Sequence, residues 1–289
     1  MDTIAGEATS AVIEIADGVY LLTGLGCNVL AVVVTDGVLI IDSGSDGDAK
    51  NLKSAIAGLD VGPVRIVLNT HSHLDHVWGN EVLAKNGAVI IAHDRVRLAM
   101  QAEWRVPDAL GLPTVPPYPE AALPMLTFVD ALTVHLGGHE IEALHFPKAH
   151  SDADAAVLLR VANVLHTGDL YVSNGFPLID SFHGGTIDGV ITAVDVLVDL
   201  IDDETTVVPG HGSLSNRREL CEYRNMLAVA RDRITVLIKG GSTLEEVVAA
   251  NPTAGLYRRG ESWMPTGFFI LTVYEDLAGQ CSSAVDAGD

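Results

Sequence analysis

The sequence predicts an α/β protein built as a four-layer sandwich, in which helices flank two mixed sheets. Two observations lead to this prediction. Short apolar runs separated by turn residues indicate strands in two stretches, residues 11–41 and 126–165. Residues 48–103 and 187–251 instead show apolar side chains at helical spacing, alternating with a few further strands. Sheets of this kind bury their apolar faces under helices, which gives the layered arrangement.

Composition limits the kind of partner. The chain has 289 residues with 48% apolar content, so it can bury a large core, and we favour one domain over residues 1–289. Acidic residues outnumber basic residues 38 to 17, which gives a formal charge of −21. Such a surface repels phosphate backbones and anionic membranes. We therefore expect a small-molecule substrate and no nucleic-acid or membrane partner, and an oligomer is compatible with the sequence.

The cysteines and the N-terminus indicate a compartment. Cys27, Cys221 and Cys281 are odd in number and widely spaced, so we interpret them as small buried hydrophobes and not as a disulfide framework or a thiolate site. The first residues lack a basic segment followed by an apolar run, and no later stretch reaches ~18 uncharged apolar residues. A soluble cytoplasmic protein is the expectation.

The first half of the chain leads into a cluster of metal-binding side chains. Strands are predicted at 12–13, 19–22, 29–34 and 38–41, then a helix at 48–59, then a strand at 64–68. This last strand leads straight into Thr70-His71-Ser72-His73-Leu74-Asp75-His76-Val77-Trp78-Gly79. In an extended segment His71, His73 and Asp75 lie on one side, and a turn into a helix brings His76 toward them. We expect these ligands at the carboxyl end of a buried strand, where open α/β sheets place their sites.

A proline-rich segment follows the next predicted elements, which are a helix at 80–85, a strand at 88–92 and a helix at 94–103. Residues 104–124 hold six of the twelve prolines together with Trp104 and Tyr118. Fixed φ angles make such a loop stiff. It is either a surface connection or a lid whose aromatic groups line a substrate cleft.

The second half of the chain offers more metal ligands after short strands. Strands are predicted at 126–128, 132–134, 140–146, 155–159, 161–165 and 206–208. His150, Asp169 and His211 each lie just after or between them. Helices are predicted at 187–200, 217–239 and 243–251, with Ser215 and Ser242 as candidate caps of the last two.

Together these landmarks resemble the metallo-β-lactamase-fold hydrolase superfamily. The resemblance rests on the His-x-His-x-Asp-His segment, on His150, Asp169 and His211 in that order, and on the strand and turn at residues 37–44. It covers nearly the whole chain and implies the αββα fold. It also implies a ligand set, in which His71, His73 and His150 hold one metal, Asp75, His76 and His211 hold a second, and Asp169 bridges both. Two Zn²⁺ suit this nitrogen and oxygen set, and iron or manganese would also be accepted.

The resemblance implies a reaction. A binuclear metal-dependent hydrolase would use a metal-bridging hydroxide to attack a carbonyl carbon in a lactone, thioester, ester or β-lactam amide. Asp75 is the candidate catalytic residue, because its second oxygen could orient the water and pass on a proton. Asp42, Thr70 and Ser72 are candidates for fixing the imidazole tautomers.

The other polar residues carry weaker predictions. We expect His93, His135, His139 and His145 to be structural or solvated, and His166 to be either a core histidine bonded to backbone or a support for the metal ligands. His183 lies in a glycine-containing loop that could border the cleft. Tyr171 could donate to an oxyanion, and Lys148 could attract a substrate carboxylate.

Several alternatives remain open within the resemblance. Glyoxalase-II-like thioesterases and lactonases share the ligand set, but the C-terminus has no basic cluster for glutathione, and Tyr171 lies two residues after Asp169 where quorum-quenching lactonases have a tyrosine three residues after it. A β-lactamase with an all-His and Asp zinc set is also allowed, whereas β-lactamases with a Cys ligand are excluded by Asp169. Di-iron redox proteins of the same fold carry Glu in place of His73 and an attached flavin domain. A metal-binding module without catalysis is the last alternative.

Overall fold

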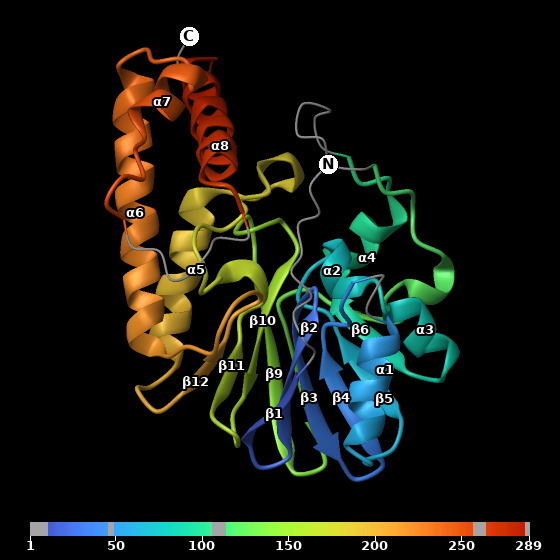
Figure 1. Cartoon of the computed structure of the whole chain (residues 1–289). Coiled ribbons are helices and arrows are strands. Elements are labelled where there is room, and N and C mark those ends of the chain that lie inside the picture. Colours follow the sequence, from blue (N-terminus) through green and yellow to red (C-terminus); the bar gives the residue numbers. More distant parts are fainter. Residues whose placement is uncertain (1–10, 46–48, 106–113, 257–263, 287–289) are drawn as a thin grey trace. The chain divides into compact units, whose positions relative to one another are not determined.

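The computed structural model describes residues 11–45, 49–105, 114–256 and 264–286 (Figure 1). The chain forms two compact units. The first comprises Met1–His145 and Ala155–Gly168, and the second comprises Phe146–Asp154 and Asp169–Asp289. The expectation of one domain over residues 1–289 stays a prediction.

The first sheet lies in the first unit and has seven strands in chain order. Neighbouring strands are antiparallel from the first to the fourth and parallel from the fourth to the seventh. The strands are β1 (Ala11–Ala16), β2 (Val19–Leu25), β3 (Cys27–Val34), β4 (Gly37–Ile41), β5 (Val64–Leu68), β6 (Val89–His93) and β7 (Leu126–Phe128). The mixed character follows from the connections, because tight turns join the early strands and helical crossovers join the later ones.

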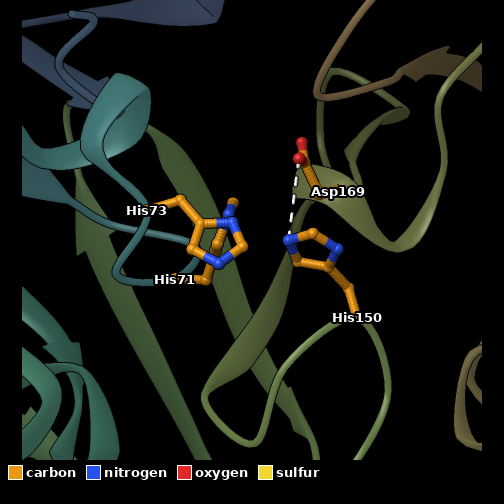
Figure 2. A group of neighbouring side chains, drawn as sticks. All are labelled: His71, His73, His150 and Asp169. Atoms are coloured by element: carbon orange, nitrogen blue, oxygen red, sulfur yellow. Dashed lines mark ion pairs between the residues drawn. The ribbon is translucent and has the colours of Figure 1, made fainter. Parts of the chain in front are cut away.

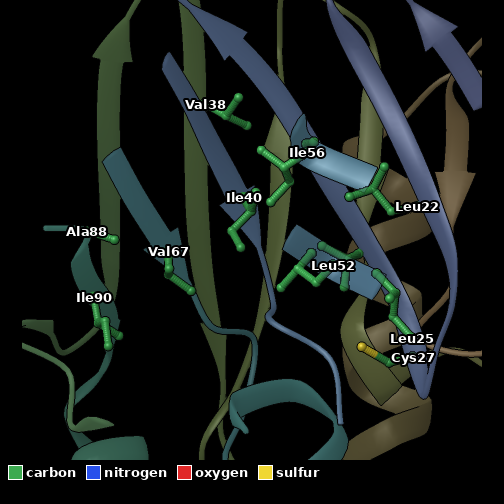
Figure 3. Packing of buried hydrophobic residues seen from close by; sticks show 12 residues of the cluster. Leu22, Leu25, Cys27, Val38, Ile40, Leu52, Ile56, Val67, Ala88 and Ile90 are labelled. Atoms are coloured by element: carbon green, nitrogen blue, oxygen red, sulfur yellow. The ribbon is translucent and has the colours of Figure 1, made fainter. Parts of the chain in front are cut away.

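Both faces of the central strands are buried, which explains their nearly continuous apolar sequences. On one face Val38, Ile40 and Val67 pack with Leu52 and Ile56 of helix α1 (Ala49–Gly58) in a single cluster (Figure 3). The alternate residues of β4, at positions 39 and 41, are also fully buried on the opposite face. The sheet is therefore a layer within the unit and not its surface.

The helices of the first unit lie in the connections between parallel strands. They are α1, α2 (Leu74–Val77), α3 (Asn80–Lys85), α4 (Asp94–Gln101) and the short 3₁₀ helix η3 (Glu120–Ala122). Parallel strands have their carboxyl ends at one edge of the sheet. Asp42 follows β4 and Asn69 follows β5, so the polar residues that come after these two strands share that edge.

The second sheet has five strands, β8 (Ala131–Leu136), β9 (His139–Phe146), β10 (Asp154–Leu159), β11 (Val164–His166) and β12 (Thr206–Val208). A two-residue turn at Gly137 and Gly138 joins β8 to β9, and both glycines have positive φ. The strand predicted at 161–165 begins too early, because residues 160–163 form the turn between β10 and β11 and Asn163 has a φ of 52°.

The second unit is mainly helical. It contains α5 (Ile187–Leu200), α6 (Arg217–Lys239), α7 (Leu244–Ala250), α8 (Thr266–Asp286) and the 3₁₀ turn η5 (Ser181–His183). It also contains all but the first residue of the 3₁₀ turn η4 (Gly168–Leu170). Helices α5 and α8 both contact the long helix α6 (Figure 1). Phe269 of α8 is fully buried and stacks on Phe176, with 4.7 Å between the ring centroids.

The predicted helix caps are wrong by one residue in both cases. Asn216 caps α6 by accepting from the backbone of Glu219, and Thr243 caps α7 in a capping box with Glu246. Ser215 is not the cap because its hydroxyl bonds the Tyr171 hydroxyl and donates to the Glu219 carboxylate, at 2.8 Å each. Ser242 precedes the capping box by one residue, so its hydroxyl is out of register with the first turn.

Two sheets of seven and five strands with accompanying helices confirm the predicted α/β fold class. Within the described part of the chain, no helix combines the length and the apolar character that crossing a membrane requires.

Candidate metal centre

The histidine-rich segment follows β5 directly, as the sequence predicts. Residues 69–73 are irregular and end at the start of α2, where His73 is extended with φ −65° and ψ 150°. His76 lies inside α2 and is fully buried. The short helix therefore turns His76 back toward the histidines that precede it.

Three imidazoles of this segment gather in the first unit. The ring centroids of His71 and His73 are 4.7 Å apart, and those of His71 and His76 are 4.1 Å apart. Figure 2 shows the rings of His71 and His73 nearly perpendicular to each other, and their interplanar angle is 77°. Clustered imidazoles in a buried place are typical of a metal site.

A buried carboxylate fixes the orientation of two of these rings. Nδ1 of His76 lies 2.7 Å from Oδ2 of Asp42, which accepts the N–H. Thr70 donates its hydroxyl to the same oxygen at 2.8 Å, and its own oxygen lies 3.0 Å from Nδ1 of His71. Because both Nδ1 atoms are engaged in this way, a metal ion would bind these rings through Nε2. Two of the three residues predicted to fix tautomers, Asp42 and Thr70, thus make the expected contacts.

Asp75 lies beside His76 and is partly exposed. Its Oδ2 is 3.5 Å from Nε2 of His76, and 30% of its side chain is accessible. A carboxylate with this exposure can reach both a metal ligand position and a molecule that arrives from solvent.

A buried amide network that sequence reasoning missed supports the same helix. Asn69 donates to the backbone carbonyl of His76 at 3.0 Å, and Asn80 donates to the side chain of Asn69 at 2.8 Å. Ser43 donates to the side chain of Asn80 at 2.9 Å. These side chains are at most 1% exposed. The only sequence signal was an asparagine directly after a buried strand.

The second unit holds another group of ligand-type side chains. Oδ2 of Asp169 lies 3.7 Å from Nε2 of His150 and 3.4 Å from Nε2 of His211. Figure 2 marks the pair of His150 and Asp169. Ligand atoms bound to one tetrahedral zinc ion at the usual bond lengths are roughly 3.3 Å apart. The spacing around Asp169 therefore fits ligands that share a cation.

Local backbone pairing sets this arrangement. Asp169 lies in η4, and the chain just after it pairs with the segment that carries His211, through a bridge between Val172 and His211. The Nδ1–H of His150 donates to the carbonyl of Leu178 at 2.8 Å, which directs Nε2 toward Asp169. His150 is fully buried, and Asp169 and His211 are 4% and 9% exposed.

Glycine is required immediately before Asp169. Gly168 has a φ of 50°, and a Cβ at this position would lie 2.7 Å from the hydroxyl oxygen of Thr70. The close approach packs this turn against the residue that bridges Asp42 and His71.

The weaker candidates have mixed outcomes. His166 donates through Nε2 to the carbonyl of Asn28 and accepts at Nδ1 from the backbone of Gly168, so it is a core histidine bonded to backbone. Tyr171 bonds Ser215, so its phenol is engaged within the second unit. His183 is held at Nδ1 by both oxygens of Asp180 at 2.8 Å. Lys148 has an exposed side chain.

Tyr223 was missed by sequence reasoning. Its ring meets Tyr171 edge to face at 4.8 Å. The hydroxyl is buried and makes no hydrogen bond within the described residues. Burial raises the pKa of Tyr223 well above its usual value, and the charges of Tyr171 and Asp169 add to this effect.

Cys27 lies closer to the histidines than its sequence position suggested. Its sulfur, an Asp42 oxygen and a His76 nitrogen all lie within 4.8 Å of one another. Burial raises the pKa of the Cys27 thiol to about 12, so it stays a neutral thiol at physiological pH. The burial of Cys27 agrees with its interpretation as a small buried hydrophobe.

The donor set fits a divalent metal. Buried imidazoles with their Nδ1 atoms held by a carboxylate, a hydroxyl and a carbonyl present Nε2 as ligand, and Asp75 and Asp169 add carboxylate oxygens. Nitrogen and oxygen donors of this kind suit zinc, iron and manganese.

The fold and these donors are those of a metal-dependent hydrolase class, and the comparisons with known proteins agree. The model of the metallo-beta-lactamase superfamily matches residues 22–211. The chain belongs to this superfamily, and the resemblance noted in the sequence is confirmed. Membership in a superfamily of hydrolases supports the prediction that this chain is an enzyme.

The matches to curated relatives span most of the length of each relative. The hydroxyacylglutathione hydrolase GloC of Haemophilus influenzae is 28% identical over 177 residues, which are 60% of this chain and 79% of the relative. An uncharacterized protein of Mycobacterium bovis is 26% identical over 199 residues, or 66% of this chain and 88% of that protein.

Solved structures show the same fold. The sec-alkylsulfatase Pisa1 from Pseudomonas sp. has a TM-score of 0.67 at 19% identity over 92% of this chain, which spans half the length of that protein. The DIM-1 metallo-beta-lactamase has a TM-score of 0.60 at 17% identity over 76% of this chain and 98% of its own. A match over 92% of the chain extends past residue 211, so the likeness to the alkylsulfatase includes part of the C-terminal helices.

Proposed function

We propose that the chain is a binuclear metal-dependent hydrolase that cleaves a carbonyl compound, with an ester, thioester, lactone or β-lactam amide as the bond broken. Two sets of donors support it. The first unit contributes His71, His73, Asp75 and His76, and the second contributes His150, Asp169 and His211. The sequence resemblance assigns these residues to two metals, with Asp169 shared between them.

Zinc is the proposed metal, with iron and manganese as alternatives that the same donors accept. When bound, the ions would supply Lewis-acid polarisation of a carbonyl group and make hydroxide available at neutral pH. The rest of the chemistry belongs to the protein's own groups.

Asp75 is the proposed catalytic residue. Its carboxylate is partly exposed beside Nε2 of His76, so one oxygen can accept a proton from the attacking water and release it to the leaving group. Burial of His71 and His76 keeps bulk water from the rings. The Asp42 carboxylate holds His76 directly and His71 through the Thr70 hydroxyl.

The proposal depends on one observation. His71, His76 and His150 each have Nδ1 bonded to a group of the protein, which leaves Nε2 as the nitrogen for a metal. Three histidines constrained in the same sense indicate ligands.

For the substrate, the proposal names only the class of bond that is cleaved. The hydroxyacylglutathione hydrolase relative favours a thioester, and the net charge of −21 favours a small substrate without many negative charges. A cytoplasmic location and an oligomeric state stay predictions from the sequence.

The test combines metal analysis with a substrate panel. Purified protein would be analysed for zinc, iron and manganese, then offered a lactone, a thioester, a cephalosporin, a phosphodiester and a secondary alkyl sulfate. We expect two metal ions per chain and turnover of a carbonyl substrate. His71→Ala and Asp169→Ala should each lose metal and activity, whereas His135→Ala, which removes an exposed histidine of β8, should keep both. Full activity in either ligand variant would contradict the assignment of the metal ligands. Two iron ions without hydrolysis would favour redox chemistry.

A further inference from the structure

We propose that Trp104, Trp78 and Tyr118 form the surface that recognises the substrate, and that it accepts an uncharged apolar acyl group. This inference rests on the proposed function and names its substrate class. These three side chains are called the aromatic surface below. All three lie in the first unit.

The first contact joins the proline-rich segment to a proposed metal ligand. The ring of Trp104 meets the ring of His73 edge to face, with centroids 6.1 Å apart and planes at 76°. Both side chains are partly exposed. The indole is therefore a partly exposed neighbour of the metal motif.

The second contact lies at the other end of α2. The ring of Tyr118 meets the ring of Trp78 edge to face, at 6.2 Å and 77°. Trp78 directly follows α2 as its C-cap, and its backbone N–H donates to the carbonyl of Leu74. Residues of the proline-rich segment therefore contact both ends of the helix that carries Asp75 and His76.

Backbone hydrogen bonds hold the aromatic surface in place. Trp104 and Val115 exchange two backbone hydrogen bonds of 2.9 and 3.0 Å. Tyr118 donates its backbone N–H to the carbonyl of Met100 at 2.9 Å, and Asn80 bonds the carbonyl of Ala122. A surface fixed at several points can discriminate between ligands, because little ordering entropy is lost on binding.

Tyr118 supplies one polar contact. Its hydroxyl is buried and has no hydrogen-bond partner among the residues that the structure describes. A buried hydroxyl without a partner is costly, so a ligand oxygen that reaches it by displacing the groups that cover it would satisfy it. Burial raises the pKa of Tyr118, and the nearby charge of Asp75 adds to this, so the phenol stays a neutral donor.

The charges around the aromatic surface exclude an anionic acyl group. Arg105 is the one cation that the sequence holds between residues 104 and 124, and it pairs with Glu103 at 2.6 Å. The negative charge of Asp75 acts on the Tyr118 hydroxyl, so a carboxylate also lies near this surface. An acyl group that carries a carboxylate would therefore contact aromatic rings without an available cationic side chain to pair with.

The test compares 4-nitrophenyl esters that share a leaving group and differ in the acyl part. Phenylacetyl is the apolar probe, acetyl the small probe and hemisuccinyl the anionic probe. We expect the wild-type protein to give its highest kcat/KM with the phenylacetyl ester. Trp104→Ala should lower that value about tenfold, mostly through KM, and leave the acetyl ester within about threefold. Trp104→Phe should recover most of the loss.

Two controls separate recognition from folding and from metal binding. Tyr20→Phe changes a partly buried tyrosine that packs on the core cluster of the first sheet, and it should leave all three esters unchanged. The metal content of Trp104→Ala should equal that of the wild type. A loss of metal would show that Trp104 serves to hold His73, and it would overturn the inference.

A binding measurement keeps this inference distinct from the proposed function. Phenylacetamide, a neutral and unreactive analogue, would be titrated into the purified protein by calorimetry. We expect binding that weakens about tenfold in Trp104→Ala and measurably in Tyr118→Phe. Absence of hydrolysis with intact binding would overturn the proposed function alone. Equal rates for the acetyl and phenylacetyl esters, a preference for hemisuccinyl, or phenylacetamide binding that neither variant alters would overturn the aromatic surface.

Discussion

The imidazole of His76 and the carboxylate of Asp42 form a fully buried pair, with 2.7 Å between Nδ1 and Oδ2. The same carboxylate accepts the backbone N–H and the hydroxyl of Thr70, which in turn contacts His71. Asp42 reaches this position with a φ of 63°, a conformation that Asp and Asn adopt more readily than other side chains. One residue thus orients two candidate ligands.

Replacing Asp42 with Asn tests that role. Asn fits the backbone and the space, but it cannot accept at both oxygens and it removes the charge that polarises His76. We expect Asp42→Asn to lower metal affinity by about 10- to 100-fold, measured by competition with a chelator. Asp36→Asn, at an exposed turn, should bind metal like the wild type. Unchanged affinity in Asp42→Asn would mean that the pair is only structural.

Replacing Gly168 with Ala tests the packing of the turn before Asp169. A Cβ there would lie 2.7 Å from the Thr70 hydroxyl oxygen, so Thr70 must shift. Gly138→Ala is the matched control, because Gly138 also has positive φ but nothing lies within 4 Å of its Cβ position. Both variants should lose about 1 kcal/mol of unfolding free energy from backbone strain. Only Gly168→Ala should also lose metal, and equal metal content in the two variants would contradict the proposed contact.

His93 should make stability depend on pH. It accepts at Nδ1 from the backbone of Arg95 at the start of α4 and stacks on His145 with 3.6 Å between centroids. Burial lowers the pKa of His93 below its usual 6.5, and the charge of His145 lowers it further. A backbone hydrogen bond at Val129 and the charge of Asp94 act in the opposite direction. A folded-state pKa below the unfolded value means that stability is full above pH 6.5 and is lost as the pH falls through the folded-state pKa.

The check is urea unfolding of wild type and His93→Asn between pH 7.5 and pH 5. Asn can still cap α4 but does not titrate. The unfolding free energy of the wild type should fall more steeply with acidification than that of the variant. Parallel curves would assign the pH dependence to other groups.

Cys27 should resist alkylation. Its thiol is buried, and a pKa of about 12 leaves roughly one molecule in a thousand as thiolate at pH 9. Folded protein treated with iodoacetamide at pH 8.5 should be labelled at Cys221, which is partly exposed, far faster than at Cys27. Peptide mapping gives the rates, and denaturant should equalise them. Rapid labelling of Cys27 in folded protein would contradict its burial.

Much of the fold could be predicted because apolar periodicity is a local signal. The strand at Val64–Leu68 and the helices at Ile187–Leu200 and Arg217–Lys239 have the predicted bounds. Helix α8 was not predicted. Its residues 268–274 are aromatic and β-branched and favour strands locally, whereas packing of Phe269 on Phe176 and contact with α6 favour the helix.

The candidate site was predictable to a similar degree. Histidines at fixed spacing can be recognised within a window of about ten residues, so the ligand candidates could be named from the sequence. Contacts between residues distant in sequence could not be predicted in this way. Asn80 reaches Ala122 across 42 positions, and the Tyr118 hydroxyl is distinctive only because it is buried without a partner. Spacing carries no information about such contacts, which depend on how the strands are ordered in the sheet.

The paired backbones of Trp104 and Val115 join two points of the chain that are eleven positions apart. Once two ends are joined, doubling the number of residues between them costs only about 0.6 kcal/mol in closure entropy. Insertions, deletions or exchanges between these two residues could therefore accumulate during evolution while the histidine segment stays intact. The same bridge gives a protein engineer two defined junctions for grafting a different segment onto an unchanged fold.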